Sequence, residues 1–293
     1  MALPGDTSYI AGALISDISN DVVVAYSDAG VTSRLAQYEW RAKADTIRIT
    51  KWNLGDQVIN SSDIASHTEG AATSASYLNS DAVTITPAGY TCRVDYTDES
   101  DLSNAGDPAG QMAKILGNAV GAKRDNLLNA LFDSFTTNTI AASTAALTVD
   151  HLYDAFGGID SSSDGSMPLF GVLYPSQLNG TYGLSNDLVT SPNFTATDAQ
   201  NSALRTARYG EVAGIDLYRS REFTVADSAV KGGVFRKDAI AIGNVGYSED
   251  APFKITPQYD ADRATWELVA FMFGGVSIVE ESYGAEIWTR YTA

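Results

Sequence analysis

The 293-residue sequence predicts an α+β protein that is organised around one unusually long helix. Three observations lead to this fold class: a helical apolar stripe from 108 to about 136, strand-like alternation on both sides of it in sequence, and short alternating elements from 148 onward. With 44% hydrophobic residues the chain can bury a sizeable core, so we expect one large or two modest domains.

The N-terminal region is polar, small and acidic up to its first basic residue, Arg34. Within it, Asp21–Tyr26 is strand-like but is surrounded by Gly and Asp. This pattern predicts an extended arm that needs a partner surface, and an ordinary mobile terminus is the alternative. The following residues, Thr32–Ala42, are predicted to form a short helix.

Two strand signals bracket a long polar stretch. Thr46–Thr50 and Ala82–Thr86 each alternate apolar and polar residues, and Ile47 and Ile49 share one face. The residues between these segments, 53–80, are rich in Ser, Ala, Asn, Asp and Gly. Structureless loops of that length are rare inside a compact domain. We therefore expect a long hairpin whose tip leaves the body of the protein.

A third strand leads into the long helix. In Tyr90–Tyr96 the alternating residues share one face with Cys92, which predicts a core thiol. Asp107–Pro108 supplies an N-cap and a proline at the first helical position. A helix from 108 to about 136 would be roughly 43 Å long. Its polar side, opposite the apolar stripe, is expected to carry Lys114, Asn118, Asp125 and Asn129.

The remaining elements are shorter and alternate between helix and strand. Gly157–Gly158 should end the helix that begins at Val149, Pro175 should open a helix, and residues 176–204 should be mostly loop. A short helix is expected at Lys237–Ile242. The expected strands are Leu169–Tyr174, Gly214–Tyr218, Gly233–Phe235, Phe253–Gln258, Arg263–Phe273 and Val276–Val279, with a turn at Asp260–Asp262.

The net charge of −17, from 19 basic and 36 acidic residues, argues against a general nucleic-acid-binding surface. Such affinity comes largely from cations that neutralise phosphates. The longest apolar run, 268–279, is interrupted by Gly and Ser and is shorter than the roughly 20 residues of a membrane span. A single cysteine and the absence of a basic, apolar leader further predict a protein made in a reducing cytoplasm, with no membrane partner.

No residue pattern supports catalysis, a cofactor or a metal. The sequence has no Gly-rich phosphate loop and no nucleophile elbow, and its only candidate histidine bases are His67 and His151. Asp160–Gly165 resembles the start of a calcium loop, but Gly171 stands where a bidentate glutamate is required. Glu280–Glu281 is more typical of a solvated face than of an acid–base pair. We therefore expect no catalytic residue, no cofactor, no metal ligand and no enzyme.

The order of the elements is more informative than any single motif. An acidic arm, a long hairpin, a long helix, a compact region and closing strands together resemble the major capsid proteins of tailed double-stranded DNA phages, which share the Hong Kong 97-like fold. Several local segments are similar as well: Thr68–Gly70 with Tyr90–Ser100, Lys123–Leu128, Val172–Gln177, Gly210–Ile215 with Gly233–Ile240, and Phe273–Ile287. The resemblance covers nearly the whole chain.

The resemblance implies the parts of that fold and a structural function. The implied parts are an N-terminal arm (1–44), an E-loop hairpin (45–86), a peripheral domain (87–147 and 248–293) that includes a long spine helix (105–137), and an axial domain (148–247). The implied function is that of a major capsid subunit. Such a subunit self-assembles through pentamers and hexamers into an icosahedral shell around packaged double-stranded DNA, in the virion, after assembly in the host cytoplasm.

Contacts between subunits are expected along the E-loop. A polar excursion that cannot fold on itself can lie across a neighbouring copy, and the expected contact residues are Trp52, Ile59, Ile64, Glu69 and Tyr77. Lys51 is the only lysine of residues 45–86 and lies near the base of the hairpin. We therefore expect no Lys–Asn isopeptide cross-link between subunits, although some members of the family form one.

Further partners follow from the same resemblance. No long coiled-coil segment precedes the arm, so a separate scaffolding protein is expected, together with a portal protein and, optionally, a decoration protein. Packaged DNA would be enclosed without specific binding, because a net charge of −17 would repel it.

Three alternatives stay open from the sequence. An encapsulin-like nanocompartment would share the fold but enclose protein cargo. A non-capsid adhesion or sugar-binding module, secreted or on a virion, would fit the 15 tyrosines and the Asn-, Thr- and Ser-rich loops, and would need no long helix. An enzyme with an unrecognised carboxylate pair is the third.

Overall fold

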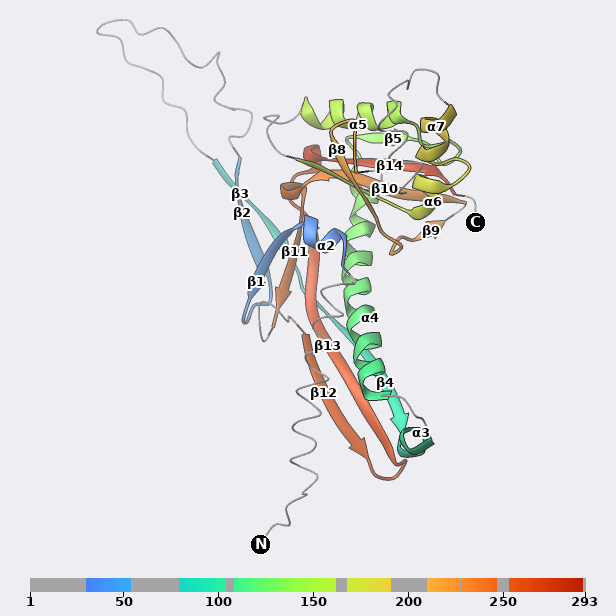
Figure 1. Ribbon diagram of the computed structural model, residues 1–293. Helices are drawn as coiled ribbons and strands as arrows, with labels where there is room; N and C mark the ends of the chain where they lie inside the picture. Colours follow the sequence, from blue (N-terminus) through green and yellow to red (C-terminus); the bar gives the residue numbers. More distant parts are fainter. Residues whose placement is uncertain are drawn as a thin grey trace, which may run out of the picture.

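One long helix, α4 (Pro108–Ala130), connects a narrow lower part of the molecule to a broader upper part (Figure 1). The computed structural model describes residues 30–53, 79–103, 108–161, 168–190, 210–226, 228–246 and 253–291. The lower part, which we call the shaft, consists of α4 and a five-stranded sheet. The upper part, which we call the head, consists of a seven-stranded sheet and its helices. This architecture confirms the predicted α+β class.

Helix α4 ends earlier than predicted. It has 23 residues and continues as a 3₁₀ turn, η2 (Leu131–Ser134), so the α-helix is about 35 Å long rather than roughly 43 Å. The chain leaves the helix because Phe132 and Phe135 are fully buried, with their rings packed directly on the backbones of Gly233 and Gly284. The predicted N-cap lies outside the described residues. No helix among the described residues is long and apolar enough to cross a membrane.

The shaft sheet is built on one long strand, β13 (Thr265–Ile278). The lower half of β13 pairs antiparallel with β4 (Ala88–Thr97) and β12 (Phe253–Asp260). Its upper half pairs antiparallel with β11 (Ile240–Val245), which pairs parallel with β1 (Gln37–Arg41). A short helix, α3 (Asp98–Ser103), follows β4 at the lower end (Figure 1).

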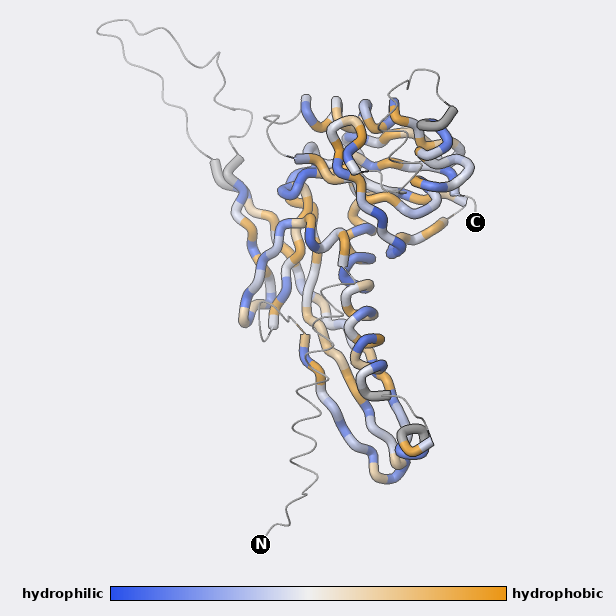
Figure 2. The backbone as a smooth tube through the Cα atoms, viewed as in Figure 1, coloured by the Kyte–Doolittle hydropathy of each residue, from blue (hydrophilic) through white to orange (hydrophobic). Residues whose placement is uncertain are grey.

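Helix α4 covers one face of the lower shaft sheet. The alternating residues of β4 face it as predicted, and Cys92 is a partly buried thiol of this core. Apolar and polar residues alternate along β4 and β12 (Figure 2). The buried residues of the core between α4 and this sheet are Met112, Ala113, Leu116, Val120, Phe253, Leu268, Ala270 and Met272.

A two-stranded antiparallel sheet projects from the body beside the shaft. Its strands are β2 (Ile47–Asn53) and β3 (Asn79–Ile85) (Figure 1). The paired ends Ile47 and Ile85 lie at the body, and the paired ends Asn53 and Asn79 lie away from it. Both predicted hairpin strands are confirmed, and Ile47 and Ile49 are both buried. Residues 54–78, including the predicted tip, lie outside the described residues.

The head sheet has the strand order β5–β14–β10–β6–β8–β7, with β9 paired to β10. Helix α5 (Val149–Asp160) packs its apolar stripe on this sheet, and α6 (Pro175–Asn179) and α7 (Leu184–Thr190) lie beside it (Figure 1). The strands are β5 (Thr139–Ala141), β6 (Leu169–Leu173), β7 (Glu211–Val212), β8 (Ile215–Arg219), β9 (Val225–Ala226), β10 (Ala229–Arg236) and β14 (Gly284–Arg290).

Packing overrides two local stop signals. Helix α5 continues through Gly157–Gly158, which were predicted to end it, because Ile159 still belongs to the head core. Strand β13 runs through Gly274–Gly275, where a break was predicted, because both glycines are paired with β11. Part of the predicted loop 176–204 is helical in α6 and α7, and residues 191–209 lie outside the described residues.

Two predicted helices are mostly strand. The range Thr32–Ala42 divides into a short helix, α2 (Thr32–Leu35), and strand β1. The range Lys237–Ile242 is a 3₁₀ turn, η3 (Lys237–Ala239), followed by β11. In both places the strand is drawn into the shaft sheet by pairing with a distant segment.

Two strands pair across the boundaries predicted for the peripheral and axial domains, and the domain assignment itself stays a prediction. Strand β14 lies in the range 248–293, predicted as peripheral, but pairs with β10 in the head sheet. Strand β11 lies in the range 148–247, predicted as axial, but pairs with β13 in the shaft sheet. A short turn, η4 (Glu281–Tyr283), lies where the chain passes from β13 into β14.

Candidate functional site

The root of the β2–β3 hairpin packs onto bare backbone. Ile47 and Ile85 are each 1% exposed and lie against Gly243 of β11 and Gly275 of β13. A Cβ atom on Gly243 would lie 2.8 Å from Cδ1 of Ile47, and one on Gly275 would lie 3.0 Å from Cγ2 of Ile85. A Cβ atom on Gly275 would also lie 2.7 Å from the carbonyl oxygen of Thr86, and one on Gly243 would have to displace Ile47, so the two glycines form a socket that holds the hairpin root.

An ion pair attaches the hairpin at a second point. The Lys51 ammonium in β2 contacts Oε2 of Glu280, which precedes η4, and both side chains are about three-quarters shielded from water. The Ser282 hydroxyl also donates to Glu280 Oε1, at 2.8 Å. Burial raises the pKa of Glu280, but the bonds from Lys51 and Ser282 outweigh it and hold the pKa below its ordinary value.

The next residue, Glu281, holds the chain that follows α4 and η2. Its Oε1 accepts hydrogen bonds from the backbone N–H groups of Thr136 and Thr137, both at 3.0 Å. The same oxygen accepts from the two threonine hydroxyls, at 2.7 and 3.0 Å. These bonds lower the pKa of Glu281, because they favour the charged carboxylate.

A buried carboxylate fixes the start of the described chain to α4. Asp125 is 0% exposed and accepts hydrogen bonds from the backbone N–H groups of Val31, Thr32 and Ser33, at 2.6, 3.1 and 3.0 Å. These are the donors that helix α2 cannot pair internally. Arg124 of α4 donates to the Ser33 hydroxyl, and the Thr32 hydroxyl donates to Oδ1 of Asn129, both at 2.7 Å.

Asp125 and Asn129 were predicted to lie on the polar side of the helix, and this prediction is wrong. Both are buried, and Asn129 also donates to the carbonyl oxygen of Glu222 at 2.8 Å. Asn129 therefore joins three separate segments: the start of the described chain, α4 and the loop after β8. No local sequence pattern predicts that these residues are buried, because their partners lie more than 90 positions away in sequence.

The predicted subunit contacts are only partly within the described residues. Trp52 lies in β2, where it pairs with Ser80 of β3. Ile59, Ile64, Glu69 and Tyr77 lie outside the described residues, so contact of all five with a neighbouring copy stays a prediction. Lys51 does lie near the hairpin base, as expected, and its ammonium is engaged within its own chain.

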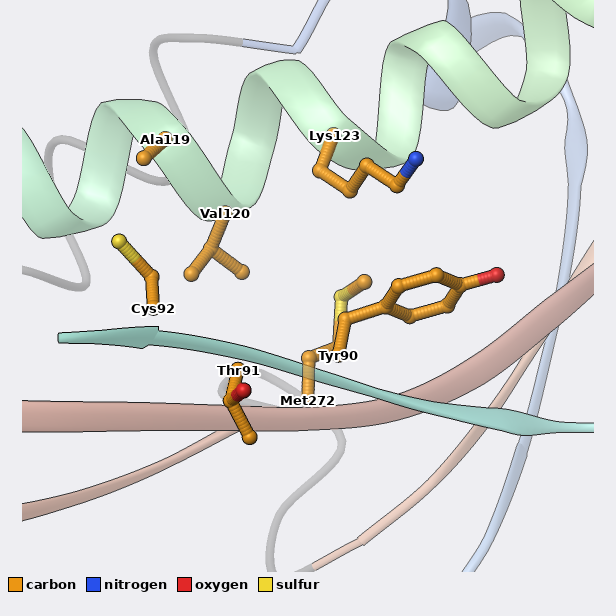
Figure 3. A pocket seen from close by; sticks show the side chains of 7 residues that line it. All are labelled: Tyr90, Thr91, Cys92, Ala119, Val120, Lys123 and Met272. Carbon is orange, nitrogen blue, oxygen red and sulfur yellow. The ribbon is translucent and has the colours of Figure 1, made fainter.

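A small cavity opens between α4 and the shaft sheet (Figure 3). Its volume of about 50 Å³ is far below the few hundred Å³ of a typical ligand site. Lys123 lies over the Tyr90 ring, 5.3 Å from its centre, and closes one side. The lining residues are Tyr90, Thr91, Cys92, Ala119, Val120, Lys123 and Met272. This cavity is a packing gap between α4 and the shaft sheet.

The candidate catalytic and metal residues that the structure describes lie within or cap its helices and strands. The His151 ring accepts from the Thr148 backbone N–H at 3.3 Å and so caps the start of α5. Asp160 is the last residue of α5 and Gly171 is in β6, whereas His67 and residues 162–167 lie outside the described residues. Among the described residues, no three His, Cys, Asp or Glu side chains gather as a metal site would require.

Comparison with known proteins identifies the fold. No family model matches the chain, and no curated protein matches it in sequence. Solved structures do match: the capsid of Ralstonia phage GP4 is 10% identical, with a TM-score of 0.65 over 88% of each chain. The capsid of the cyanophage P-SCSP1u is 14% identical, with a TM-score of 0.64 over 90% of this chain and 89% of that one. The chain has the Hong Kong 97-like fold.

An encapsulin is also among the similar solved structures. The holo-SrpI encapsulin complex from Synechococcus elongatus PCC 7942 is 11% identical, with a TM-score of 0.57 over 89% of each chain. The predicted fold class is thus confirmed over nearly the whole chain.

Proposed function

We propose that this chain is the major capsid subunit of a tailed phage, which self-assembles into an icosahedral shell around packaged double-stranded DNA. The observation that carries the proposal is a Hong Kong 97-like fold over about nine-tenths of the chain, matched to phage capsids at a TM-score of up to 0.65. The proposed function is structural rather than enzymatic, because the matched solved structures are capsids and phage heads.

The hairpin supplies the physical reason for assembly. Its root is buried, but Arg48, Thr50, Asp81 and Thr84 farther along the strands are exposed. Among the described residues β2 and β3 pair only with each other, and an isolated two-stranded sheet is marginally stable in water. A neighbouring subunit would provide the missing surface, through the predicted contact residues Trp52, Ile59, Ile64, Glu69 and Tyr77.

In this proposal the hairpin is the E-loop and α4 is the spine helix. The subunit partners are further copies of the chain in pentamers and hexamers, a separate scaffolding protein, a portal protein and, optionally, a decoration protein. The net charge of −17 supports enclosure of DNA without specific binding. The assembled protein would reside in the virion after assembly in the host cytoplasm.

Negative-stain microscopy of the expressed protein, with and without a co-expressed scaffolding protein, tests the proposal. We expect closed particles from the wild type. Asn53 and Asn79 are paired at the outer ends of β2 and β3, so a variant with Asn-Gly in place of residues 54–78 keeps a favourable two-residue turn. That variant should fold with an unchanged melting temperature but form no closed particles. Normal particles from it would refute the assembly role of the hairpin.

An encapsulin-like shell is the second candidate, favoured by the match to the SrpI encapsulin. The content of purified particles separates the two: packaged double-stranded DNA supports the capsid proposal, and a protein cargo supports the encapsulin. The adhesion-module alternative required no long helix and gains no support from a fold organised around α4.

A further inference from the structure

The chain between β13 and β14 contacts three different parts of the molecule. We call residues 279–283 the bridge segment. Through Glu280 it contacts Lys51 of the hairpin, and through Glu281 it holds Thr136 and Thr137, which follow η2. The backbone N–H of Val279 donates to the carbonyl oxygen of Ala239 at 2.8 Å, which fixes the segment to η3. The bridge segment therefore lies where hairpin, shaft and head meet.

We propose that the Lys51–Glu280 ion pair is a positioning contact that sets the direction in which the hairpin leaves the body and links that direction to the junction of α4 with the head. This inference rests on the proposed function, because it assigns the contact that aims the assembly hairpin. The contact between these two residues is observed in this chain and does not follow from the fold.

Two fixed points define the direction of a strand, whereas one leaves it free to swing. The first point is the buried root, where Ile47 meets Gly243 and Ile49 packs in the same cluster as Ala241 and Val245. Lys51 is four residues beyond Ile47 and two beyond Ile49, or about 13 Å and about 7 Å at 3.3 Å per residue. Its contact with Glu280 is thus a second point beyond the root. A two-stranded ribbon held at both points can no longer pivot about its root.

The bridge segment also explains how the hairpin direction is coupled to the rest of the subunit. Glu280 and Glu281 are adjacent, so a shift of one backbone moves the other. Glu281 is held by four hydrogen bonds from Thr136 and Thr137, in the segment that leads from η2 into β5. A change in the angle between α4 and the head would therefore be transmitted to Glu280 and, through Lys51, to the hairpin.

The test measures hairpin direction in the unassembled subunit, isolated by gel filtration. Spin labels on cysteines introduced at Thr50 of β2 and Asp154 of α5, in a Cys92→Ser background, report the distance between hairpin and head. Both sites are exposed. We expect one narrow distance distribution for the wild-type contact. Lys51→Glu and Glu280→Lys should each broaden and displace it, and the double variant with exchanged charges should restore the narrow peak.

Several comparisons keep the result specific. Glu280→Lys leaves Asp81, opposite Lys51 in the hairpin register, untouched. Lys114→Glu makes the same charge change on the exposed side of α4 and should leave the distance unchanged. If a charge reversal prevents folding, Lys51→Met and Glu280→Gln replace it and should broaden the distribution likewise. A narrow, unshifted peak in the single variants, or no restoration by the exchange, overturns the proposal.

Particle formation is measured separately on the same variants. Loss of closed particles in the single variants and recovery in the exchanged variant would support the role of the contact in assembly. If the wild type forms no particles but its variants show the expected distance changes, the proposed function is refuted and the positioning contact is supported.

Discussion

Removal of the Asp125 carboxylate, which is fully buried on α4, should destabilise the subunit strongly. In wild type, this carboxylate accepts three backbone hydrogen bonds, from Val31, Thr32 and Ser33. Asp125→Ala leaves those donors without a partner. Thr32 is 0% exposed and Ser33 is 7% exposed, so water cannot replace the acceptor without local opening.

The magnitude follows from the two buried donors. An unpaired buried donor costs about 1–3 kcal/mol, which gives about 2–6 kcal/mol for Thr32 and Ser33 together. These donors belong to the short helix α2, whose opening would let water in and limit the loss. We therefore predict a decrease of about 2–4 kcal/mol in the free energy of unfolding for Asp125→Ala. Asp125→Asn keeps one acceptor oxygen and should lose about half as much.

Urea unfolding of the unassembled subunit, followed by circular dichroism, measures the difference. Asn118→Ala, at an exposed position on the same helix, is the matched control and should stay within about 0.5 kcal/mol of wild type. Hydrogen exchange should accelerate at residues 31–33 in Asp125→Ala alone. If Asp125→Ala were as stable as the Asn118→Ala control, the reasoning about this buried carboxylate would be wrong.

Three further predictions concern packing and pH. Gly243→Ala places a Cβ atom 2.8 Å from Ile47, and overpacking of this kind should cost about 1–3 kcal/mol in urea unfolding. Gly157→Ala meets no atom within 4 Å in the middle of α5 and should instead raise the melting temperature, with a gain of about 0.4–1 kcal/mol; a loss there would contradict the helix assignment. Because the pKa of Glu281 in the fold is lower than its ordinary value of 4.5, the charged carboxylate stabilises the fold above pH 4.5. This contribution is lost as pH falls from 4.5 through the lowered pKa. Glu281→Gln should therefore be less stable than wild type at neutral pH, and the gap should close in acid, as measured by unfolding at pH 7 and pH 3.

The sequence predicts most of the fold where the signal is local. Period-two alternation correctly placed Ile47 and Ile49 of β2 and the face of β4 that carries Cys92, because one side of each strand is buried. The apolar stripe correctly predicted α4, and Pro175 correctly predicted the start of α6. These features depend on neighbouring residues alone.

The sequence does not predict what depends on distant partners. Asp125 looks like a solvated residue of an amphipathic helix, and only the donors at residues 31–33 explain its burial. The contact between Lys51 and Glu280 joins segments 229 positions apart. Gly157–Gly158 are valid stop signals locally, but the packing of Ile159 in the head core favours continuation of the helix. The same limit applies to β11 and β14, which pair with strands on the other side of the predicted domain boundaries.

A cryo-electron microscopy reconstruction of particles assembled from this chain tests the central claim most directly. We predict a closed icosahedral shell in which the hairpin beyond its buried root contacts the adjacent copy through Trp52, Ile59, Ile64, Glu69 and Tyr77. A hairpin folded back onto its own subunit, or a protein that stays monomeric with and without a scaffolding protein, would contradict the claim.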